Sequence, residues 1–301
     1  MYLENINSPA DVKAVGIDKL DILAGEVRKH LLQKLSDHGG HIGPNLGMVE
    51  ATVALHYVFN SPIDKMVFDV SHQSYAHKML TGRKDAFLNP AEYDEVSGYT
   101  EPSESEHDQF VVGHTSTSVS LACGLAKGRD LKGGKENVIA VIGDGSLSGG
   151  EALEGLDMAA ELDTNIIIVV NDNQMSIAEN HGGLYKNLQL LRETNGGAQC
   201  NLFKAMGLDY VYVGEGNNVK ALVEAFQKVK DTTRPVVVHI NTVKGKGYKF
   251  AEEQKERFHW GFPFVIETGE TKKEYQFGPD FGVHTAQMLL DEMQKDPAVV
   301  A

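Results

Sequence analysis

The chain of 301 residues has little cysteine, no long apolar run and few basic side chains for its acidic content. Its two cysteines, Cys123 and Cys200, lie far apart and outside any CxxC pattern. This arrangement argues against a disulfide framework and a zinc site, and it fits a reducing compartment such as the cytoplasm. No stretch approaches the roughly 18 apolar residues of a membrane-spanning helix, and the polar N-terminus is unlike a signal peptide.

The charge balance limits the kinds of partner that the chain can have. The 42 acidic and 28 basic residues give a formal net charge of −14, which argues against a nucleic-acid-binding surface. With 42% hydrophobic and 23% charged residues, the composition is that of a globular protein with an ample core. We therefore expect a cytoplasmic protein that binds neither nucleic acid nor membrane.

Short apolar runs alternate with amphipathic helical patterns along most of the chain. Strands are expected at residues 66–70, 138–142, 166–170, 209–213 and 236–240. Helices are expected after an N-cap at Asp18 and at residues 48–59, 151–162, 219–230 and 283–294, and the Gly- and Pro-rich run 39–47 is expected to be a loop. This alternation predicts an α/β fold with a mostly parallel sheet and helices on both faces.

Two oxygen-bearing turns follow successive strands near the middle of the chain. Gly-Asp-Gly at 143–145 ends one strand, and Asn-Asp-Asn at 171–173 ends the next. Ligands of open parallel sheets bind beyond the carboxyl ends of the strands, so both turns should face one site. The glycines let the backbone approach a phosphate, but the Asp144 carboxylate would repel it unless a cation lay between them. Mg²⁺ resolves the conflict, with oxygen ligands from Asp144, the Asn173 amide and a backbone carbonyl near Met175.

A lone Gly-Asp-Gly is most often only a turn between a strand and a helix. Asn173, however, lies 29 residues after Asp144, at the end of the next strand. A Gly-Asp-Gly turn followed at this distance by an Asn-containing turn resembles the thiamine diphosphate fingerprint. We therefore favour a site for Mg²⁺ and thiamine diphosphate over a plain turn.

Other polar segments are expected at the same edge of the sheet. His72 follows the strand 66–70, the run 244–248 follows the last strand, and a Gly-His-Thr-Ser-Thr-Ser run at 113–118 opens a helix. Hydroxyl and backbone N–H groups at a helix start favour anions. Each segment has an ordinary alternative, because His72 or His77 can be a satisfied interior histidine and the Thr/Ser run can be a plain helix cap.

Together these segments resemble the N-terminal half of 1-deoxy-D-xylulose-5-phosphate synthase, within the transketolase group of thiamine diphosphate enzymes. The likeness extends from about Ser8 to His259. It rests on motifs that occur in the same order in that family: Gly39-Gly40-His41, His72-Gln73-Ser74-Tyr75 with His77-Lys78, Thr81-Gly82-Arg83, Ser103-Glu104-Ser105-Glu106, the runs 113–118, 143–145 and 171–173, and Lys246-Gly247-Tyr248.

The resemblance implies a role for each matching residue. Asp144, Asn173 and the carbonyl of Met175 would hold Mg²⁺. The residues that would contact the cofactor are His72, Gly113, His114, Thr115, Gly145, Ser146, Asn173 and Tyr248. His41 and His259 would face the reacting carbonyl carbon, where they would stabilise developing oxyanions or move protons.

The resemblance also implies a reaction, the transfer of a two-carbon unit to an aldose phosphate-like acceptor. The synthase takes this unit from pyruvate with loss of CO₂, whereas transketolase takes it from a ketose, and the sequence leaves the donor open. Four places depart from the usual synthase pattern, and all border the expected substrate side: Glu101-Pro102 replaces Lys-Arg, Pro44-Asn45 replaces small or hydroxyl residues, Ser71 replaces Gly and Ala76 replaces Pro.

Enzymes of this group carry a second, pyrimidine-binding domain with a Glu that activates the cofactor. We expect residues 1–245 to form the diphosphate- and Mg²⁺-binding domain, 246–280 a linker with the active-site His259, and 281–301 the first helix of the pyrimidine-binding domain. The chain would then be the N-terminal subunit of a split enzyme, inactive without a C-terminal partner subunit in an α₂β₂ assembly. The alternatives are a fragment of a full-length synthase and a non-catalytic scaffold or regulatory relative.

Overall fold

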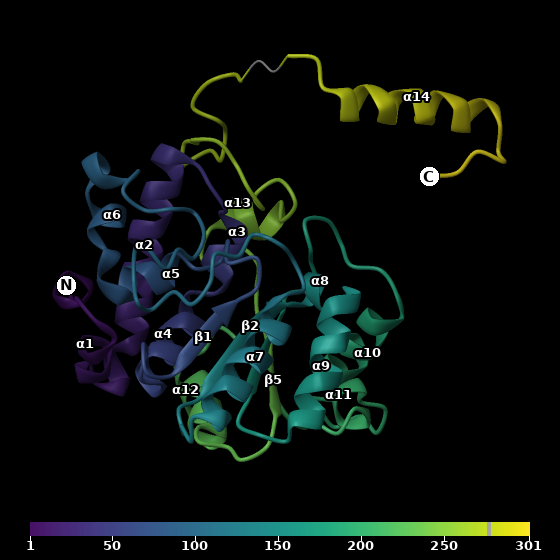
Figure 1. Ribbon diagram of the computed structural model, residues 1–301. Helices are drawn as coiled ribbons and strands as arrows, with labels where there is room; N and C mark the ends of the chain where they lie inside the picture. Colours follow the sequence, from purple (N-terminus) through teal and green to yellow (C-terminus); the bar gives the residue numbers. More distant parts are fainter. Residues whose placement is uncertain (276–277) are drawn as a thin grey trace. The chain divides into compact units, whose positions relative to one another are not determined.

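A five-stranded parallel sheet forms the centre of the first of two compact units in the computed structural model (Figure 1). The structure describes residues 1–275 and 278–301. The first unit is Met1–Glu270 and the second is Thr271–Ala301. The strands are β1 Lys65–Phe68, β2 Val138–Gly143, β3 Ile167–Asp172, β4 Asp209–Val213 and β5 Val236–Asn241, in the order β1-β2-β3-β5-β4. This arrangement confirms the α/β fold with a parallel sheet that the sequence predicted.

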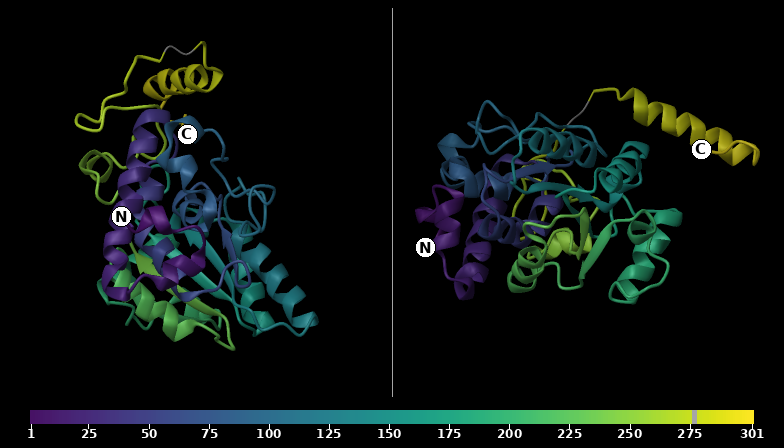
Figure 2. Two further views of the ribbon diagram at one scale, coloured as in Figure 1. Left: turned by 90° about the vertical axis from the view of Figure 1, so that its left-hand side faces the viewer. Right: turned by 60° about the horizontal axis from the view of Figure 1, so that its bottom comes forward.

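Helices cover both faces of this sheet (Figures 1 and 2). The longer helices of the first unit are α2 Leu20–His38, α4 Val49–Val58, α7 Ser118–Leu131, α9 Gly150–Leu162, α10 Gly183–Glu193 and α12 Val219–Val229. The shorter ones are α1 Pro9–Ala14, α3 Gly43–Gly47, α5 Tyr75–Lys78, α6 Asp85–Leu88, α8 Asp144–Leu147, α11 Leu202–Ala205 and α13 Lys249–Glu253. No helix of the described residues is both long and apolar enough to cross a membrane.

Two apolar cores lie on opposite faces of the sheet because successive strand residues point to opposite sides. Ile139 and Val141 of β2 belong to the core beneath α2, α4 and α12. Ala140 and Ile142 belong to the core beneath α7, α9 and α10. Burial on both faces explains why the central strands read as continuous apolar runs.

The strand register brings the polar turns to one edge. Gly143 at the end of β2 pairs with Asn171 in β3, and Asp172 pairs with Asn241 at the end of β5. The turns that follow β2, β3 and β5 therefore start at nearly the same height. Segments that are far apart in sequence meet beyond this edge.

Two local expectations near the N-terminus were wrong. Asp18 does not cap the first long helix, because α2 begins at Leu20 after a 3₁₀ turn, Ile17–Lys19, and the Asp18 carboxylate pairs with Lys19. The run 39–47 is not wholly loop, because its second half forms the short helix α3 with Pro44 in its first turn. Proline is compatible with that position because the N–H that it lacks would have no helical partner.

The expected linker is partly built into the first unit. Residues 246–270 belong to that unit, and Gly40 and Gly261 exchange backbone hydrogen bonds of 2.8 and 2.9 Å. Residues 276 and 277 of the expected linker lie outside the described residues. The second unit contains the helix α14 Phe281–Lys295, whose N-cap Asp280 accepts a hydrogen bond from the N–H of Val283.

A buried amide joins the starts of three strands at the edge opposite the turns. Asn137 donates to Asp64 at 3.0 Å and to Asp231 at 2.9 Å. Its carbonyl oxygen accepts from Asn165 at 3.0 Å and from the N–H of Asp231 at 2.8 Å. Asp64, Asn137 and Asn165 precede β1, β2 and β3, so one side chain fixes how these strands begin.

Asn137→Ala should lower the free energy of unfolding by about 2–4 kcal/mol, because it leaves several buried polar groups without partners. Urea denaturation followed by circular dichroism measures the change. The matched control Gln189→Ala, at an exposed position of α10, should change stability by less than about 0.5 kcal/mol. Equal effects of the two substitutions would contradict this role of Asn137.

Candidate functional site

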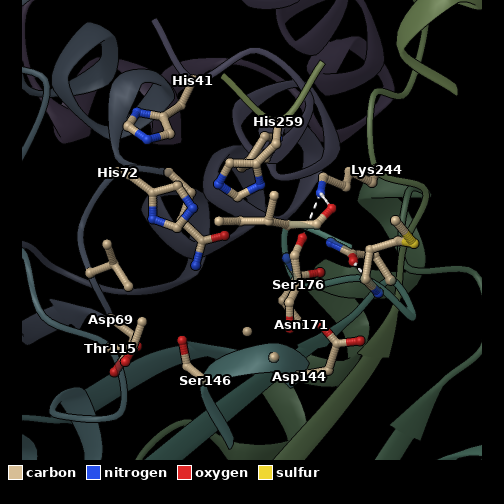
Figure 3. Close-up of a pocket in the computed structure, with 18 residues that line it drawn as sticks. His41, Asp69, His72, Thr115, Asp144, Ser146, Asn171, Ser176, Lys244 and His259 are labelled. Atoms are coloured by element: carbon tan, nitrogen blue, oxygen red, sulfur yellow. Dashed lines mark hydrogen bonds between the residues drawn. The ribbon is translucent and has the colours of Figure 1, made fainter. Parts of the chain in front are cut away.

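A cavity of about 320 Å³ lies beyond the carboxyl ends of the strands (Figure 3). Three imidazoles gather at one end, and carboxylate, amide and hydroxyl groups gather at the other. Nine of the twelve expected site residues line it: His41, His72, Thr115, Asp144, Gly145, Ser146, Asn173, Met175 and His259. Its volume is in the range of small-molecule sites.

The oxygen-rich end is organised around Asp144, the first residue of α8, which is only 1% exposed. Burial raises the pKa of Asp144 well above its ordinary value, and the neighbouring Asp172 raises it further. Burial also acts to raise the pKa of Asp172, but the hydrogen bond from His239 and the charge of Arg192 outweigh it and lower that pKa. A cation bound beside Asp144 would favour the ionised form of this carboxyl group.

The turn after β3 folds over Asp144. Asn173 accepts a hydrogen bond from the N–H of Met175 at 3.1 Å, and Asn180 donates to Asp144 at 2.9 Å. Gly145 allows this approach, because a Cβ atom there would lie 2.2 Å from Oγ of Ser176. Asn173 and Met175 thus line the same cavity as Asp144.

This set of oxygen groups suits a hard cation. No group of three or more His, Cys, Asp or Glu side chains within residues 1–275 and 278–301 is arranged to hold a metal ion. The expected site differs in composition, since it combines one carboxylate with one amide and one backbone carbonyl. Such a set leaves positions for phosphate oxygens, as is usual for Mg²⁺.

The other end of the cavity is a triangle of His41, His72 and His259. Their ring centroids lie 4.8 Å apart for His41 and His72, 5.7 Å for His41 and His259, and 5.5 Å for His72 and His259. Burial lowers the pKa of His41 to about 4, of His72 to about 3 and of His259 to about 4. All three rings are therefore neutral at pH 7, and each ring has one N–H donor and one acceptor nitrogen.

Two of these rings have a buried nitrogen without a hydrogen-bond partner in the described part of the chain. Nδ1 of His72 and Nδ1 of His259 lack a hydrogen-bond partner among the described residues. Buried polar atoms normally have such partners, so unpaired ones in a cavity indicate a binding site. Both residues line the cavity.

Backbone contacts hold the histidines in place. The Asn45 side chain, 1% exposed, donates to the carbonyls of His41 at 2.8 Å and His72 at 2.7 Å. The N–H of Ile42 donates to the carbonyl of His259 at 3.2 Å. Gly39 has a φ of +86°, and a Cβ atom there would lie 2.6 Å from the Gly261 carbonyl, so glycine is required. Asn45, one of the departures from the family pattern, therefore helps to position the site.

The run 113–118 reaches the cavity through Thr115. Asp69 accepts hydrogen bonds from the N–H groups of Ser116 and Ser118, both at 2.9 Å, and so caps α7. Ser116 donates to the carbonyl of Ser146 at 2.7 Å, which joins this run to the turn after β2. Gly113 and His114 are exposed and lie outside the cavity lining, and His114 contacts its neighbour Thr115.

Tyr248 also lies outside the cavity lining. It is 5% exposed and packs against the rings of Phe250, Phe258 and Phe264. Its hydroxyl donates to the carbonyl of Ile266 at 3.0 Å. In this chain its contacts support the segment that carries His259.

His77 is an interior histidine, as the alternative interpretation had it. It is fully buried and bonded to Asp108 at 2.9 Å and to His56 at 2.9 Å. Asp108 also accepts from Arg83 at 2.7 Å, so the acidic segment around it is anchored in the core. Ser71, where the family pattern has Gly, donates to the carbonyl of Val112 at 2.8 Å and strengthens this anchoring.

Several lining residues were not assigned to the site from the sequence. They include Asp69, Asn171, Ile177 and Lys244. For Asp69, Asn171 and Lys244 the available indication was their position directly after β1, at the end of β3 and after β5, because these places belong to the ligand edge. Residue type alone did not identify them.

Two family models match the chain. The model described as 1-deoxy-D-xylulose-5-phosphate synthase matches residues 3–200, and that of the thiamine diphosphate binding domain of transketolase matches residues 115–299. Solved transketolases are similar in fold: that of Campylobacter jejuni has a TM-score of 0.64 at 20% identity and covers 83% of this chain and 41% of its own. The Leishmania mexicana enzyme has a TM-score of 0.60 at 20% identity, with 94% and 48% covered.

Curated relatives are more similar in sequence. The 1-deoxy-D-xylulose-5-phosphate synthase of Caldanaerobacter subterraneus is 42% identical over 99% of this chain and 54% of its own length. Synthase 1 of Geobacter sulfurreducens is 42% identical over 89% of this chain and 48% of its own. The chain spans about half the length of the curated relatives it matches. The resemblance inferred from the motifs is confirmed: this chain belongs to the 1-deoxy-D-xylulose-5-phosphate synthase family, which shares the thiamine diphosphate binding domain of transketolase.

Proposed function

We propose that this chain binds Mg²⁺ and thiamine diphosphate in the cavity and forms the N-terminal part of a transferase. The enzyme moves a two-carbon unit from a ketose or pyruvate to an aldose phosphate-like acceptor. The observation that carries the proposal is the buried Asp144 carboxylate beside Asp172, in the same cavity as the triangle of neutral histidines.

The residues present fit the proposed cofactor. Asp144, Asn173 and the carbonyl of Met175 would hold Mg²⁺, and Gly145, Ser146 and Thr115 offer backbone and hydroxyl groups beside it. The imidazoles of His41, His72 and His259 offer hydrogen-bonding groups at the other end. Gly113, His114 and Tyr248, which lie outside the lining, would contribute through the loops that they belong to.

The cofactor, when bound, supplies the carbon nucleophile of this chemistry. The chain positions it and supplies neutral imidazoles at the reacting end. A neutral ring can donate its N–H to a developing oxyanion and accept a proton at its other nitrogen. His41 and His259 carry these roles in the proposal, and their partial burial keeps both rings neutral at pH 7.

A partner domain is also part of the proposal. The C-terminal pyrimidine-binding part is either a separate subunit, in an α₂β₂ assembly in the cytoplasm, or a further part of the same protein. Two exposed apolar side chains support a partner domain of either kind. Ile177 lines the cavity and is 61% exposed, and Trp260, next to His259, is 47% exposed. Exposed apolar side chains beside a site favour cover by another surface. The alternative, a non-catalytic scaffold, gives no physical reason to keep Asp144, Asn173 and the three histidines together.

Purification of the chain from its own source with Mg²⁺ and thiamine diphosphate should yield an active complex with the C-terminal part. Native mass spectrometry identifies the partner and the cofactor. Release of CO₂ from pyruvate would identify a synthase-type donor, and consumption of ketose phosphate without CO₂ a transketolase-type donor. A chain that arrives without cofactor and catalyses neither reaction would refute the proposal.

Asp144→Asn should weaken binding of Mg²⁺ and thiamine diphosphate at least about 100-fold, or roughly 2.7 kcal/mol, because the amide cannot neutralise the cation. Calorimetric titration of the native assembly measures this. Without Mg²⁺ the variant should be as stable as the unsubstituted protein to within about 1 kcal/mol, since a neutral amide suits the place beside Asp172. The exposed Asp157→Asn on α9 is the control and should bind normally. Undiminished binding by Asp144→Asn would remove the metal assignment.

The histidine cavity should make the protein sensitive to acid. The folded-state pKa of His72, about 3, lies below its ordinary value near 6.5, so the unfolded state takes up the proton first. The stabilising contribution is complete above about pH 6.5 and is lost as the pH falls towards 3. From about pH 7 to pH 5 the free energy of unfolding should therefore fall in both proteins. The fall should be about 1–2 kcal/mol smaller in His72→Asn than in the unsubstituted protein. Urea unfolding at both pH values tests this, with the exposed His181→Asn as control. Identical pH dependence in all three proteins would show that His72 is not buried neutral.

A further inference from the structure

Lys244 follows β5 and points into the cavity near His259 (Figure 3). The residue is 1% exposed, and its Nζ donates to the carbonyl of Ser176 at 2.6 Å and to that of Ile177 at 3.4 Å. A buried ammonium group is costly unless such partners satisfy it. Of the described residues that line the cavity, Lys244 is the only lysine or arginine.

The stem of Lys244 is fixed as firmly as its end group. The N–H of the next residue, Gly245, donates to the carbonyl of Gly43 at 3.0 Å. A Cβ atom on Gly43 would lie 3.2 Å from Cγ of Lys244, so the stem packs tightly against α3. The ammonium group is thus held at a defined point between the edge of the sheet and the turn after β3.

That turn carries the Met175 carbonyl of the proposed cation site. Asn180 also ties the turn to the core, but it does so through Asp144, whose carboxylate the cation would take. The hydrogen bonds from Lys244 involve no proposed metal ligand, so they can persist when the cation binds. Ser176 and His259 both line the cavity, so the segment that Lys244 holds adjoins both ends of it.

We propose that Lys244 is a positioning residue: its ammonium group clamps the carbonyls of Ser176 and Ile177 and so orients the Met175 carbonyl towards the cation. The inference rests on the proposed function and deepens it. It assigns to Lys244 no contact with substrate and no proton transfer.

Lys34 provides a matched control. Its Nζ also donates to two backbone carbonyls, those of Ala86 and Tyr93, both at 2.9 Å, and the residue is 6% exposed. It lies outside the lining of the proposed cofactor cavity. Lys34→Met therefore removes the same kind of buried ammonium clamp elsewhere in the protein.

The experiment compares Lys244→Met, Lys244→Arg and Lys34→Met in the native assembly. Fluorescence of Trp260, the single tryptophan of the chain, follows titration with thiamine diphosphate in the presence of Mg²⁺. Amide hydrogen exchange of residues 174–179 is measured without cofactor. Lys244→Met should weaken binding about 10- to 100-fold and speed exchange in this segment. Lys244→Arg should restore most of both, since arginine can also donate to two carbonyls, and Lys34→Met should leave both unchanged.

Unchanged exchange and affinity in Lys244→Met would overturn the proposal, as would an equal loss of affinity in Lys34→Met. Failure of the unsubstituted assembly to bind thiamine diphosphate would instead refute the proposed function. In that case the exchange comparison still decides whether Lys244 holds the turn. The two failures are therefore distinguishable.

Discussion

The constraint on which the site depends is the burial of the Asp144 carboxylate next to Asp172. Burial and like charge both raise the pKa of Asp144, while His239 and Arg192 keep Asp172 ionised. A positive charge bound beside Asp144 would therefore stabilise the ionised form of its carboxyl group. In the proposed function a divalent cation would supply this charge, and the diphosphate that it attracts would lie over the glycine turn of residues 143–145. The same electrostatic arrangement explains why a carboxylate is present where a phosphate is proposed to bind.

The parallel register converts this local demand into a complete cavity. Because β2, β3 and β5 end at nearly the same height, their turns meet without long loops. The histidines are positioned differently, by backbone hydrogen bonds between the loop before α3 and the segment that carries His259. Asn45 adds two hydrogen bonds that fix His41 relative to His72. Strand pairing thus sets the oxygen-rich end, and loop packing sets the imidazole end.

The sequence predicted the strands and the residues whose chemistry is local. Continuous apolar runs indicated buried parallel strands, and the spacing between Asp144 and Asn173 indicated one site. It placed Lys244 at the ligand edge but could not indicate the contacts of Lys244 or Asn45, because their partners are backbone carbonyls, which leave no residue pattern. It indicated the wrong start for the first long helix, because the Asp18 carboxylate pairs with Lys19 instead of capping it. It also missed the short helix at residues 43–47, which is wholly buried and so depends on tertiary packing. Tyr248 shows the same limit, since a motif fixes its place in the chain but not where its ring packs.

The charge of the cavity bears on how substrate would be chosen. The three imidazoles are neutral at pH 7, and Lys244, the one lysine or arginine among the described lining residues, is committed to backbone carbonyls. Glu101 and Pro102 stand where the family pattern has Lys-Arg, so that segment adds no positive charge. A carboxylate or phosphate group of a substrate would need cationic partners to be bound tightly. We infer that such partners lie on the surface that covers the cavity. Discrimination between pyruvate and a ketose phosphate would then belong to that surface, while this chain would provide the proposed cation site and the neutral imidazoles for either reaction.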